Sequence, residues 1–412
     1  MSPFPDDLPG ASSGDPMNDV PLFREIQRVL LSSPGPVNWE LARQVGIATA
    51  SWGEDDPAPT EEDGRGFVET VRLAELEVAE FTGLPSPTEI ADIQVFRRAQ
   101  WVEANVRGLR EMLEPVAVKL GSALSEAGAL PGSAGTFGLP GASGVSGPEA
   151  IEGAGGQAEL MGAMMQRVAP LLLGAQVGAV LGYLAQRVLG QYDLAVPRES
   201  GAVYFVIPNI ARFERDWSLP PMDFRTWVAL HEVTHRFEFA QPWVRPHFLD
   251  LVRDLVEHAE LDFSGLEQRM ESMDFSDPEA LSEAFEGMGN FFGTGTDPEQ
   301  RLRIGRVQAF MAAAEGYGDH VMESLGRRML PSFARIEEAL TRYREGRHGD
   351  QALERLLGLE MKQEQYRLGR DFCDRVVELT DESTLSRMWD SAEALPSMPE
   401  LEEPSLWLSR MA

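Results

Sequence analysis

Cysteine is almost absent from the sequence, and positive charge is scarce relative to negative charge. The 412 residues include a single cysteine, Cys373, so neither an intramolecular disulfide nor a metal cluster of several cysteines can form. The 36 lysine and arginine residues face 66 aspartate and glutamate residues, which gives a formal net charge of −30 at pH 7. Such a charge repels phosphate backbones and anionic lipid surfaces. We therefore expect neither nucleic acid nor a membrane as a partner.

A secretory signal is also missing from the first twenty residues. This segment, MSPFPDDLPGASSGDPMNDV, carries prolines and acidic residues where a signal needs a basic start followed by an apolar run. The near absence of cysteine suits a reducing compartment. Together these features predict a cytoplasmic protein.

Two segments are rich in residues that resist ordered packing. Residues 1–20 are dominated by Pro, Gly, Ser and Asp and offer little apolar surface to offset the entropy of ordering, so we predict a disordered acidic tail. Residues 128–157 have a glycine at every third position from Gly132 to Gly147, and we predict a flexible surface loop. A collagen-like triple helix would need a much longer run with plentiful proline.

The other two segments, residues 21–127 and 158–412, have the apolar spacing of folded structure. In the first, apolar residues recur at helical intervals, which predicts a helical N-terminal region. Helices are expected there near residues 71–81, 90–106 and 109–124. The second segment contains the chemically informative residues, and we expect it to pack with the N-terminal helices as one unit.

The most apolar stretch of the chain, residues 168–185, is interrupted by a proline and a glutamine. It is short for a membrane-spanning helix, which needs about 20 apolar residues. Gly174, Gly178 and Gly182 recur at intervals of four, so they share one face of a helix. We therefore predict a buried central helix that packs closely through this glycine face.

A strand is predicted just before the helix that carries the most informative residues. Residues 203–207 are β-branched or aromatic and have turn formers on both sides, which is typical of a strand. After two prolines, Asp223 is a suitable N-cap for a helix from Phe224 to about Ala240, and Pro242 ends the run.

Within this helix, the sequence His231-Glu232-Val233-Thr234-His235 is an HExxH motif. Residues four apart lie on one face of a helix, so His231 and His235 can direct two imidazoles at a single ion. Glu232 is turned by about 100° from His231 and can reach a water on that ion. Its carboxylate is then placed to act as a general base.

A catalytic zinc centre needs a third protein ligand, and the extended HExxHxxGxxH pattern does not supply it here. Glu238 stands where that pattern has glycine, and Gln241 stands where it has the third histidine. The metzincin arrangement is therefore excluded. Spacing leaves five candidates open: His247, Glu257, His258, Glu260 and the more distant Glu315.

The segment around Glu315, AEGYGDH, has a chemically complete set of side chains. Glu315 and Asp319 are four residues apart and share a helical face. Glu315 could bind the metal while Asp319 accepts the second N–H of a ligating imidazole, which would fix the ring tautomer and raise its basicity.

Several segments of the chain resemble one family. They are PGPVNWELARQVG, LLLGAQVGAVLGYLAQRVLGQYDL, VALHEVTHRFEF, AAAEGYGDHVME and KQEQYRLGRDFCDRV. Together they resemble an actinobacterial family of zincin-like hydrolases, whose members are often labelled zinc-dependent metalloproteases. Some members carry a label that associates them with biosynthesis of the deazaflavin coenzyme. The resemblance covers most of the chain from Phe23 to Leu408, outside the acidic tail and the glycine-rich loop.

The resemblance implies a mostly α fold with a small sheet, an α+β arrangement of zincin-like metalloprotease type with HExxH on a central helix. It also implies Zn²⁺ as the cofactor, bound by His231, His235 and Glu315, with Glu232 as the catalytic carboxylate. The chain departs from the commoner family spelling Glu-Gly-His by having Tyr317. It also departs from well-known glutamate-zincins, because Glu315 follows His235 by 80 residues.

Such a site predicts hydrolysis by a zinc-bound water. Zinc lowers the pKa of its bound water from about 15.7 towards about 7, and Glu232 takes the proton as the water attacks a polarised carbonyl. The developing oxyanion needs a donor opposite the metal. By residue type, Tyr317, His320 and Tyr366 are candidates for this stabilising role.

The sequence therefore predicts a zinc-dependent metallohydrolase. Among such enzymes, it favours a metallopeptidase. Two alternatives stay open. One is a metal-binding scaffold or regulatory protein without turnover, and the other is a hydrolase of a small non-peptide amide. A peptide or a small amide is thus the expected substrate, and no pattern indicates an oligomeric state.

Overall fold

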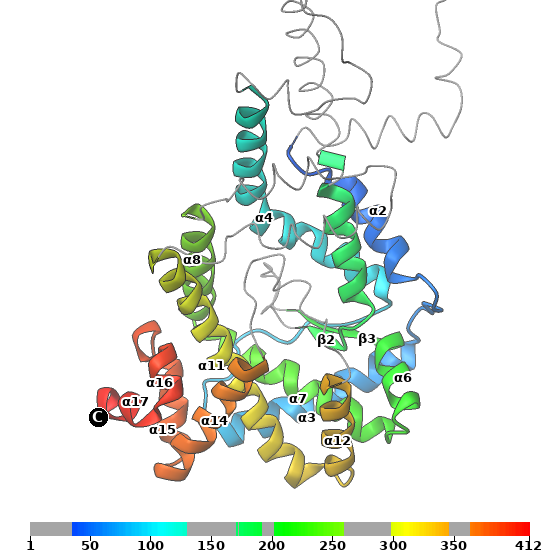
Figure 1. The fold of residues 1–412 in the computed structure, drawn as a ribbon. Coiled ribbons are helices and arrows are strands. Elements are labelled where there is room, and N and C mark those ends of the chain that lie inside the picture. Colours follow the sequence, from blue (N-terminus) through cyan, green and yellow to red (C-terminus); the bar gives the residue numbers. More distant parts are fainter. Residues whose placement is uncertain (1–34, 130–169, 172, 192–201, 259–297, 346–362) are drawn as a thin grey trace, which may run out of the picture.

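Helices form most of the described chain, and a small sheet lies between two groups of them (Figure 1). The computed structural model describes residues 35–129, 170–171, 173–191, 202–258, 298–345 and 363–412. The predicted acidic tail lies outside these ranges, as does the predicted glycine-rich loop except for its first two residues. The arrangement confirms a mostly α fold with a small sheet.

The helices differ widely in length. They are α2 (Trp39–Ala50), α3 (Glu61–Thr82), α4 (Arg98–Ala129), α6 (Ile207–Asp216), α7 (Pro221–Phe239), α8 (Val244–Glu257), α11 (Pro298–Met329), α12 (Phe333–Glu345), α14 (Gln363–Leu379), α15 (Glu382–Ser386), α16 (Met398–Glu402) and α17 (Pro404–Met411). Residues 173–185 are also helical. Short 3₁₀ turns, η3 (Arg387–Trp389) and η4 (Ala392–Ala394), lie before α16.

Three strands form the sheet in the order β1, β3, β2. Strand β1 (Ile93–Phe96) runs parallel to β3 (Val203–Val206), with Ile93 opposite Val203. Strand β2 (Gly190–Gln191) runs antiparallel to β3, with Gly190 opposite Phe205. All four residues of β3 are buried, as expected for an apolar strand with a neighbour on each side.

The predicted strand at residues 203–207 is confirmed, although Ile207 already begins α6. The prediction of a helix at residues 90–106 is wrong in part, because residues 93–96 form β1 and the helix starts only at Arg98. The sequence IQVF in β1 alternates β-branched and other side chains, and pairing with β3 favours the extended form over the helix.

The helix that carries HExxH begins three residues earlier than its predicted start at Phe224. Helix α7 starts at Pro221, and Asp223 lies in its first turn. Proline is well suited to this position because its ring presets the helical φ and its missing N–H would have had no partner. The Asp223 carboxylate instead accepts hydrogen bonds from the backbone N (3.0 Å) and Oγ (2.5 Å) of Ser332. It therefore ties the start of α7 to the turn before α12.

The glycine face of the apolar helix packs against α2. A Cβ on Gly174, Gly178 or Gly182 would overlap backbone atoms of the α2 region, so the two helices approach more closely than larger side chains allow. Leu181 and Ala185 of the same helix are fully buried. The described part of residues 168–185 thus confirms a helix that packs through its glycine face, but the burial is one-sided, because Ala179 is exposed. Within the described chain, no helix is long and apolar enough to cross a membrane.

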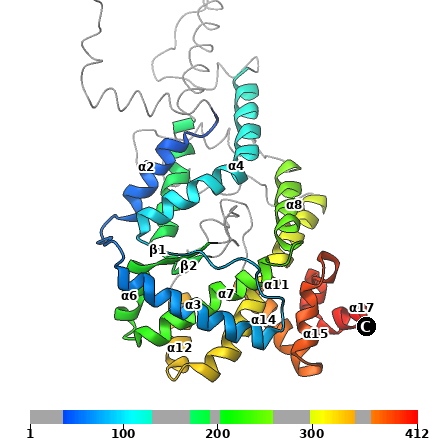
Figure 2. The same ribbon diagram turned by 180° about the vertical axis from the view of Figure 1, so that it is seen from behind.

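The motif helix α7 lies on the opposite side of the sheet from α2, next to α3 (Figure 2). It also packs against α11, which in turn packs against α14. Helices α11 and α14 meet at Gly316 and Gly369, where a Cβ on either glycine would overlap the other helix. This packing brings the central turns of α7 and α11 together beneath the sheet.

Candidate metal centre

The two histidines of HExxH lie together on the face of α7 that meets α11. Their ring centroids are 4.5 Å apart and their planes are inclined by 80°. His235 is 2% exposed, whereas His231 is half-buried. Local helical geometry accounts for this pairing, since a spacing of four residues places side chains one above the other.

Glu315 of α11 completes a cluster with these histidines. One potential ligand atom from each of His231, His235 and Glu315 lies within 4.8 Å of the other two. Oε2 of Glu315 is 4.0 Å from Nε2 of His235. Among the described residues this is the group of three or more His, Cys, Asp or Glu side chains that could hold a metal ion.

The other candidates for a third ligand lie elsewhere or outside the described ranges. Glu257 and His258 are exposed at the end of α8, and His258 pairs with Asp254 at 3.1 Å. His247 packs beside Trp243 and Phe310. Glu260 is not among the described residues. The tertiary structure therefore selects Glu315 from the open set as the neighbour of the two histidines.

Glu238, for which we predicted no role from the sequence, contacts the second ring nitrogen of His235. Nδ1 of His235 lies 2.9 Å from Oε2 of Glu238. Glu238 is three residues further along α7 and has no exposed surface. Such a partner fixes the tautomer and the orientation of a ligating imidazole, a role that we expected for Asp319. The signal lay in the sequence as the i, i+3 spacing of His235 and Glu238.

The charges around His235 leave a surplus of negative charge. Burial disfavours its protonated ring, but the carboxylates of Glu238, Glu315 and Glu232 outweigh burial and raise the pKa of His235 to about 10. For Glu238, burial is the main cause of a pKa that is raised to about 7. Nε2 of His235 is buried and has no hydrogen-bond partner in the described structure. A cation bound at this nitrogen would offset the surplus negative charge and would give Nε2 a partner.

Contacts on the other side orient His231. Its Nδ1 lies 3.1 Å from Sδ of Met322 on α11, which leaves Nε2 as the ring nitrogen for the cluster. Its ring also stacks on Trp227 at a centroid distance of 6.3 Å and an angle of 5°. Contacts within the chain therefore orient both imidazoles: Glu238 orients that of His235, and Met322 and Trp227 orient that of His231.

Glu232 lies against the backbone of strand β2. It is 4% exposed, and a Cβ built on Gly190 would lie only 2.7 Å from its Cγ and 2.8 Å from its Cδ. No larger residue fits at position 190 without moving the carboxylate. We did not predict this contact, because a lone glycine at the start of a two-residue strand carries no distinct signal.

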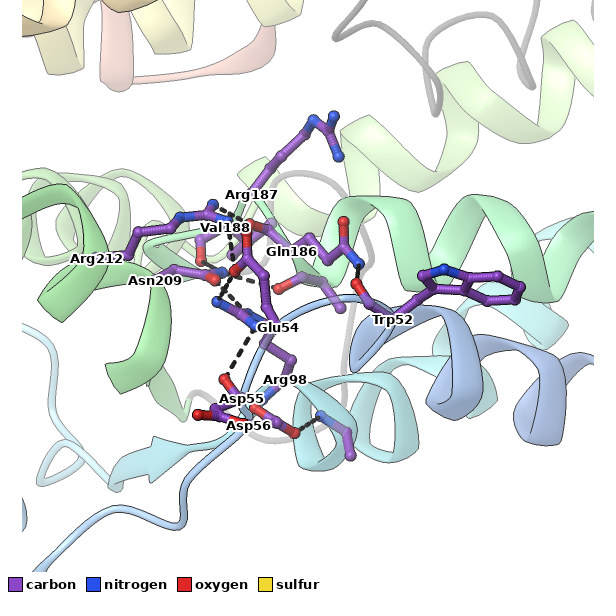
Figure 3. Close-up of polar contacts among 12 residues, drawn as sticks. Trp52, Glu54, Asp55, Asp56, Arg98, Gln186, Arg187, Val188, Asn209 and Arg212 are labelled. Carbon is purple, nitrogen blue, oxygen red and sulfur yellow. Dashed lines mark hydrogen bonds and ion pairs between the residues drawn. The ribbon is translucent and has the colours of Figure 1, made fainter. Parts of the chain in front are cut away.

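A buried polar network fixes the chain just before β2 (Figure 3). The side-chain amide of Asn209 donates to the carbonyl oxygens of Ala185 (2.8 Å) and Val188 (2.7 Å). Its Oδ1 accepts from Nε of Arg98 at 2.6 Å. Arg212 donates to the carbonyl of Gln186, also at 2.6 Å. Because residues 185–188 lead directly into β2, this network fixes the position of Gly190 next to Glu232.

Asp319 lies one turn after Glu315 on α11 and is partly buried. Between them, Gly318 lets the α11 backbone approach the ring of His235, since a Cβ there would be 3.2 Å from Cε1 of the imidazole. The structure thus gives the role at Nδ1 of His235 to Glu238. A supporting role of Asp319 within the metal centre stays a prediction.

The three candidate oxyanion donors are not gathered at the cluster by the described contacts. The hydroxyl of Tyr317 lies 3.4 Å from Oγ of Ser386, and its ring packs on Trp389. His320 places Nδ1 2.6 Å from Asp374 and Nε2 3.1 Å from Glu382. The helix turns by about 200° between positions 315 and 317, so Tyr317 leaves α11 on the opposite face from Glu315. The side chain of Tyr366 is outside the described structure.

Comparison with known proteins shows the family of the chain. The model of the zincin-like metallopeptidase family matches residues 37–408, and the chain belongs to this family. A crystal structure from Chloroflexus aurantiacus, described as "a putative hydrolase with a novel fold", is 34% identical with a TM-score of 0.62. That similarity covers 91% of this chain and 98% of the other. No curated protein matches the sequence.

Family membership confirms the resemblance at the level of a zincin-like hydrolase. It supports a zinc metallohydrolase, because the family implies a metal that is usually zinc. The cluster of two histidines and a glutamate offers a site for such an ion. An actinobacterial origin and an association with deazaflavin coenzyme biosynthesis stay expectations from the sequence.

Proposed function

We propose that the chain is a zinc-dependent metallopeptidase in which His231, His235 and Glu315 hold the metal and Glu232 is the general base. One observation carries the proposal above all. The ligand atoms of these three residues lie within 4.8 Å of one another, although Glu315 follows HExxH by 80 residues.

The donor set fits zinc in number and in type. Two imidazoles and one carboxylate are the protein ligands of many catalytic zinc sites, which keep a fourth position open. The buried Nε2 of His235, without a hydrogen-bond partner in the described structure, faces Glu315 at 4.0 Å. When bound, zinc supplies Lewis-acid polarisation of a carbonyl and lowers the pKa of a water molecule.

The chain itself contributes proton transfer and orientation. The carboxylate of Glu232 takes a proton from the attacking water as the new C–O bond forms, and it delivers this proton to the leaving nitrogen as the C–N bond breaks. Its place against Gly190 limits the positions that it can adopt. Glu238 accepts the Nδ1–H of His235 and so keeps Nε2 directed towards Glu315.

The sheet supports an extended peptide as the substrate. Strand β3 is flanked on both sides, so it offers no edge. Strand β2 is an outer strand of the described sheet and contacts Glu232 through Gly190. An extended peptide can add to such an edge through backbone hydrogen bonds. A carbonyl bound alongside β2 would then lie close to the general base.

Metal content and hydrolysis together test the proposal. Zinc would be measured by mass spectrometry on the native chain, on His231→Ala and Glu315→Ala, and on His258→Ala as a matched control with an exposed histidine. We expect about one zinc per chain in the native protein and the control, and loss of zinc in the other two variants. Full zinc retention by Glu315→Ala would overturn the ligand set.

Activity would be measured on a peptide library with and without a chelator. We expect cleavage that the chelator abolishes and that Glu232→Gln reduces by several orders of magnitude while its zinc content stays unchanged. Stoichiometric zinc without peptide cleavage would reject the peptidase. A panel of small non-peptide amides would then separate an amide hydrolase from a scaffold without turnover.

A further inference from the structure

A pocket with a volume of about 520 Å³ lies beside the polar network that precedes β2. Small-molecule sites are typically clefts of about 300–1,000 Å³. Three arginines line this pocket, namely Arg187, Arg212 and Arg342 of α12. In a chain with a net charge of −30, three guanidinium groups around one cavity are an exception that calls for an anionic partner.

The floor of the pocket is poor in negative charge relative to its arginines. Glu54 accepts from Nη1 of Arg212 at 2.6 and 2.7 Å. The same carboxylate accepts from Nη2 of Arg98 at 2.6 Å. Figure 3 shows both guanidinium groups converging on Glu54. The Glu54 carboxylate thus contacts two guanidinium groups, of which Arg98 is almost fully buried and is also within the electrostatic influence of Asp56.

The electrostatics of this floor agree with crowding of positive charge. Burial lowers the pKa of Arg98, and the charge of Arg212 acts in the same direction against the attraction of Glu54 and Asp56. Although burial acts to raise it, the pKa of Glu54 is lowered by its hydrogen bond to Arg212 and by the charges of Arg212 and Arg98. A further anion above Arg212 would therefore find an attractive field.

The other two arginines of the lining, Arg187 and Arg342, already contact side chains or backbone of the chain. Arg342 pairs with Glu338 on the exposed face of α12, where both side chains are more than half exposed, so this ion pair contributes little. Arg187 points its guanidinium away from the Glu54 network (Figure 3), stacks it over the ring of Tyr183 and donates from Nη1 to the carbonyl oxygen of Tyr183 at 3.0 Å. A ligand would have to compete with these contacts. Asp216, the second acidic side chain of the pocket, is exposed.

Aromatic rings form the apolar part of the pocket wall. Phe213 packs on Trp217 at a centroid distance of 6.0 Å and on Tyr343 at 5.1 Å, and all three line the cavity. A flat apolar group can pack against such rings, while guanidinium groups bind carboxylates and phosphates through paired hydrogen bonds. We propose that this pocket binds a small organic anion, a carboxylate or a phosphate joined to a flat apolar group.

The proposal is independent of hydrolysis at the metal centre. Leu189 lines the pocket and precedes Gly190, which contacts Glu232, whereas no residue of the metal cluster is among the lining residues. An anion could also bind at a metal ion in that cluster. The test therefore has to separate the arginines from the cluster. Binding to the full chain is measured directly, without a substrate.

Isothermal titration calorimetry would use phenyl phosphate, benzoate and inorganic phosphate as probes, with benzamide as the neutral counterpart of benzoate. We expect both aromatic anions to bind more tightly than benzamide, and phenyl phosphate to bind more tightly than inorganic phosphate. Binding should weaken by about tenfold or more in the double variant Arg187→Gln/Arg342→Gln, because charge-assisted hydrogen bonds are lost. The control Arg375→Gln, an exposed arginine of α14 paired with Glu378, should bind like the native chain.

The variant His231→Ala separates the pocket from the metal cluster. We expect it to bind the aromatic anions as the native chain does. Loss of binding in His231→Ala with full binding in the arginine variant would place the anion at the metal and overturn the proposal. Equal affinity for benzoate and benzamide, or no binding of any probe, would overturn it as well. Circular dichroism of each variant confirms that the fold is intact.

Discussion

His235 and Glu238 form a buried pair on α7, with Nδ1 of the imidazole 2.9 Å from Oε2 of the carboxylate. Their side chains are 3% and 0% exposed. Glu238 occupies the position where metzincins have the glycine that lets the chain turn towards a third histidine. Here α7 continues to Phe239, and the third candidate ligand comes from α11 instead. The presence of glutamate instead of glycine at position 238 thus excludes the metzincin arrangement and supplies a partner for His235.

Replacing Glu238 by glutamine should weaken zinc binding without unfolding the chain. Glutamine keeps the shape of the side chain but removes the charge that favours the Nδ1–H tautomer, and loss of such partners typically reduces metal affinity by about 10–100-fold. Competition with a chromophoric chelator measures the affinity. Glu378→Gln, an exposed carboxylate on α14, is the control. Equal zinc affinity in Glu238→Gln and the native chain would contradict this role.

A methyl group at position 190 should disable Glu232 while the metal ligands stay in place. In Gly190→Ala, the added Cβ would lie 2.5 Å from Oε1 of Glu232, so the carboxylate or the strand has to move. We expect peptide cleavage to fall by about tenfold or more, with zinc content unchanged. The matched control is Gly66→Ala on α3, where an added Cβ meets nothing within 4 Å. Full activity of Gly190→Ala would show that this contact does not position the base.

Asn209 should be one of the most sensitive polar positions of the fold. Asn209→Ala leaves the carbonyl oxygens of Ala185 and Val188 and the Nε–H of Arg98 without their partner. Buried groups without partners cost about 1–3 kcal/mol each, so we expect a loss of at least about 3 kcal/mol in the free energy of unfolding. Urea denaturation measures it. Ser409→Ala, which removes an exposed hydrogen bond, should change stability by less than about 0.5 kcal/mol, and a similarly small effect at Asn209 would contradict the network.

His320 should make stability depend on pH. Burial would lower its pKa, but hydrogen bonds to Glu382 and Asp374 and the charges of these carboxylates raise it. The groups around it are Phe81 of α3, Asp374 of α14, Glu382 of α15 and, beside Asp374, Arg370. Because the pKa is higher in the folded chain, the stabilisation is complete below the unfolded value of about 6.5 and is lost as pH rises through the raised pKa.

The variant His320→Gln measures this contribution. We expect its destabilisation relative to the native chain to be largest near pH 5.5 and to shrink as the pH rises above about 7. Urea denaturation across this range is the measurement. His258→Gln, at an exposed histidine, is the control. A destabilisation of His320→Gln that is constant with pH would assign the effect to packing alone.

The sequence by itself determined the features that depend on local periodicity. Four residues make about one turn of a helix, so HExxH places His231 beside His235 wherever that helix packs. The same reasoning holds for the glycine face that packs on α2. The apolar run that forms β3 was also evident, because its residues favour a buried, extended chain.

Only the tertiary structure decided which distant segments meet these local elements. The packing of α11 on α7 brings Glu315 to the histidines, and the same helix turns Tyr317 and His320 towards the C-terminal helices. The pairing of residues 93–96 with β3 overrode a helical pattern. Gly190 meets Glu232 because Asn209 and Arg212 anchor the preceding turn. The spacing of residues along a helix is set by its own hydrogen bonds, whereas contacts between helices depend on side-chain packing across the whole chain.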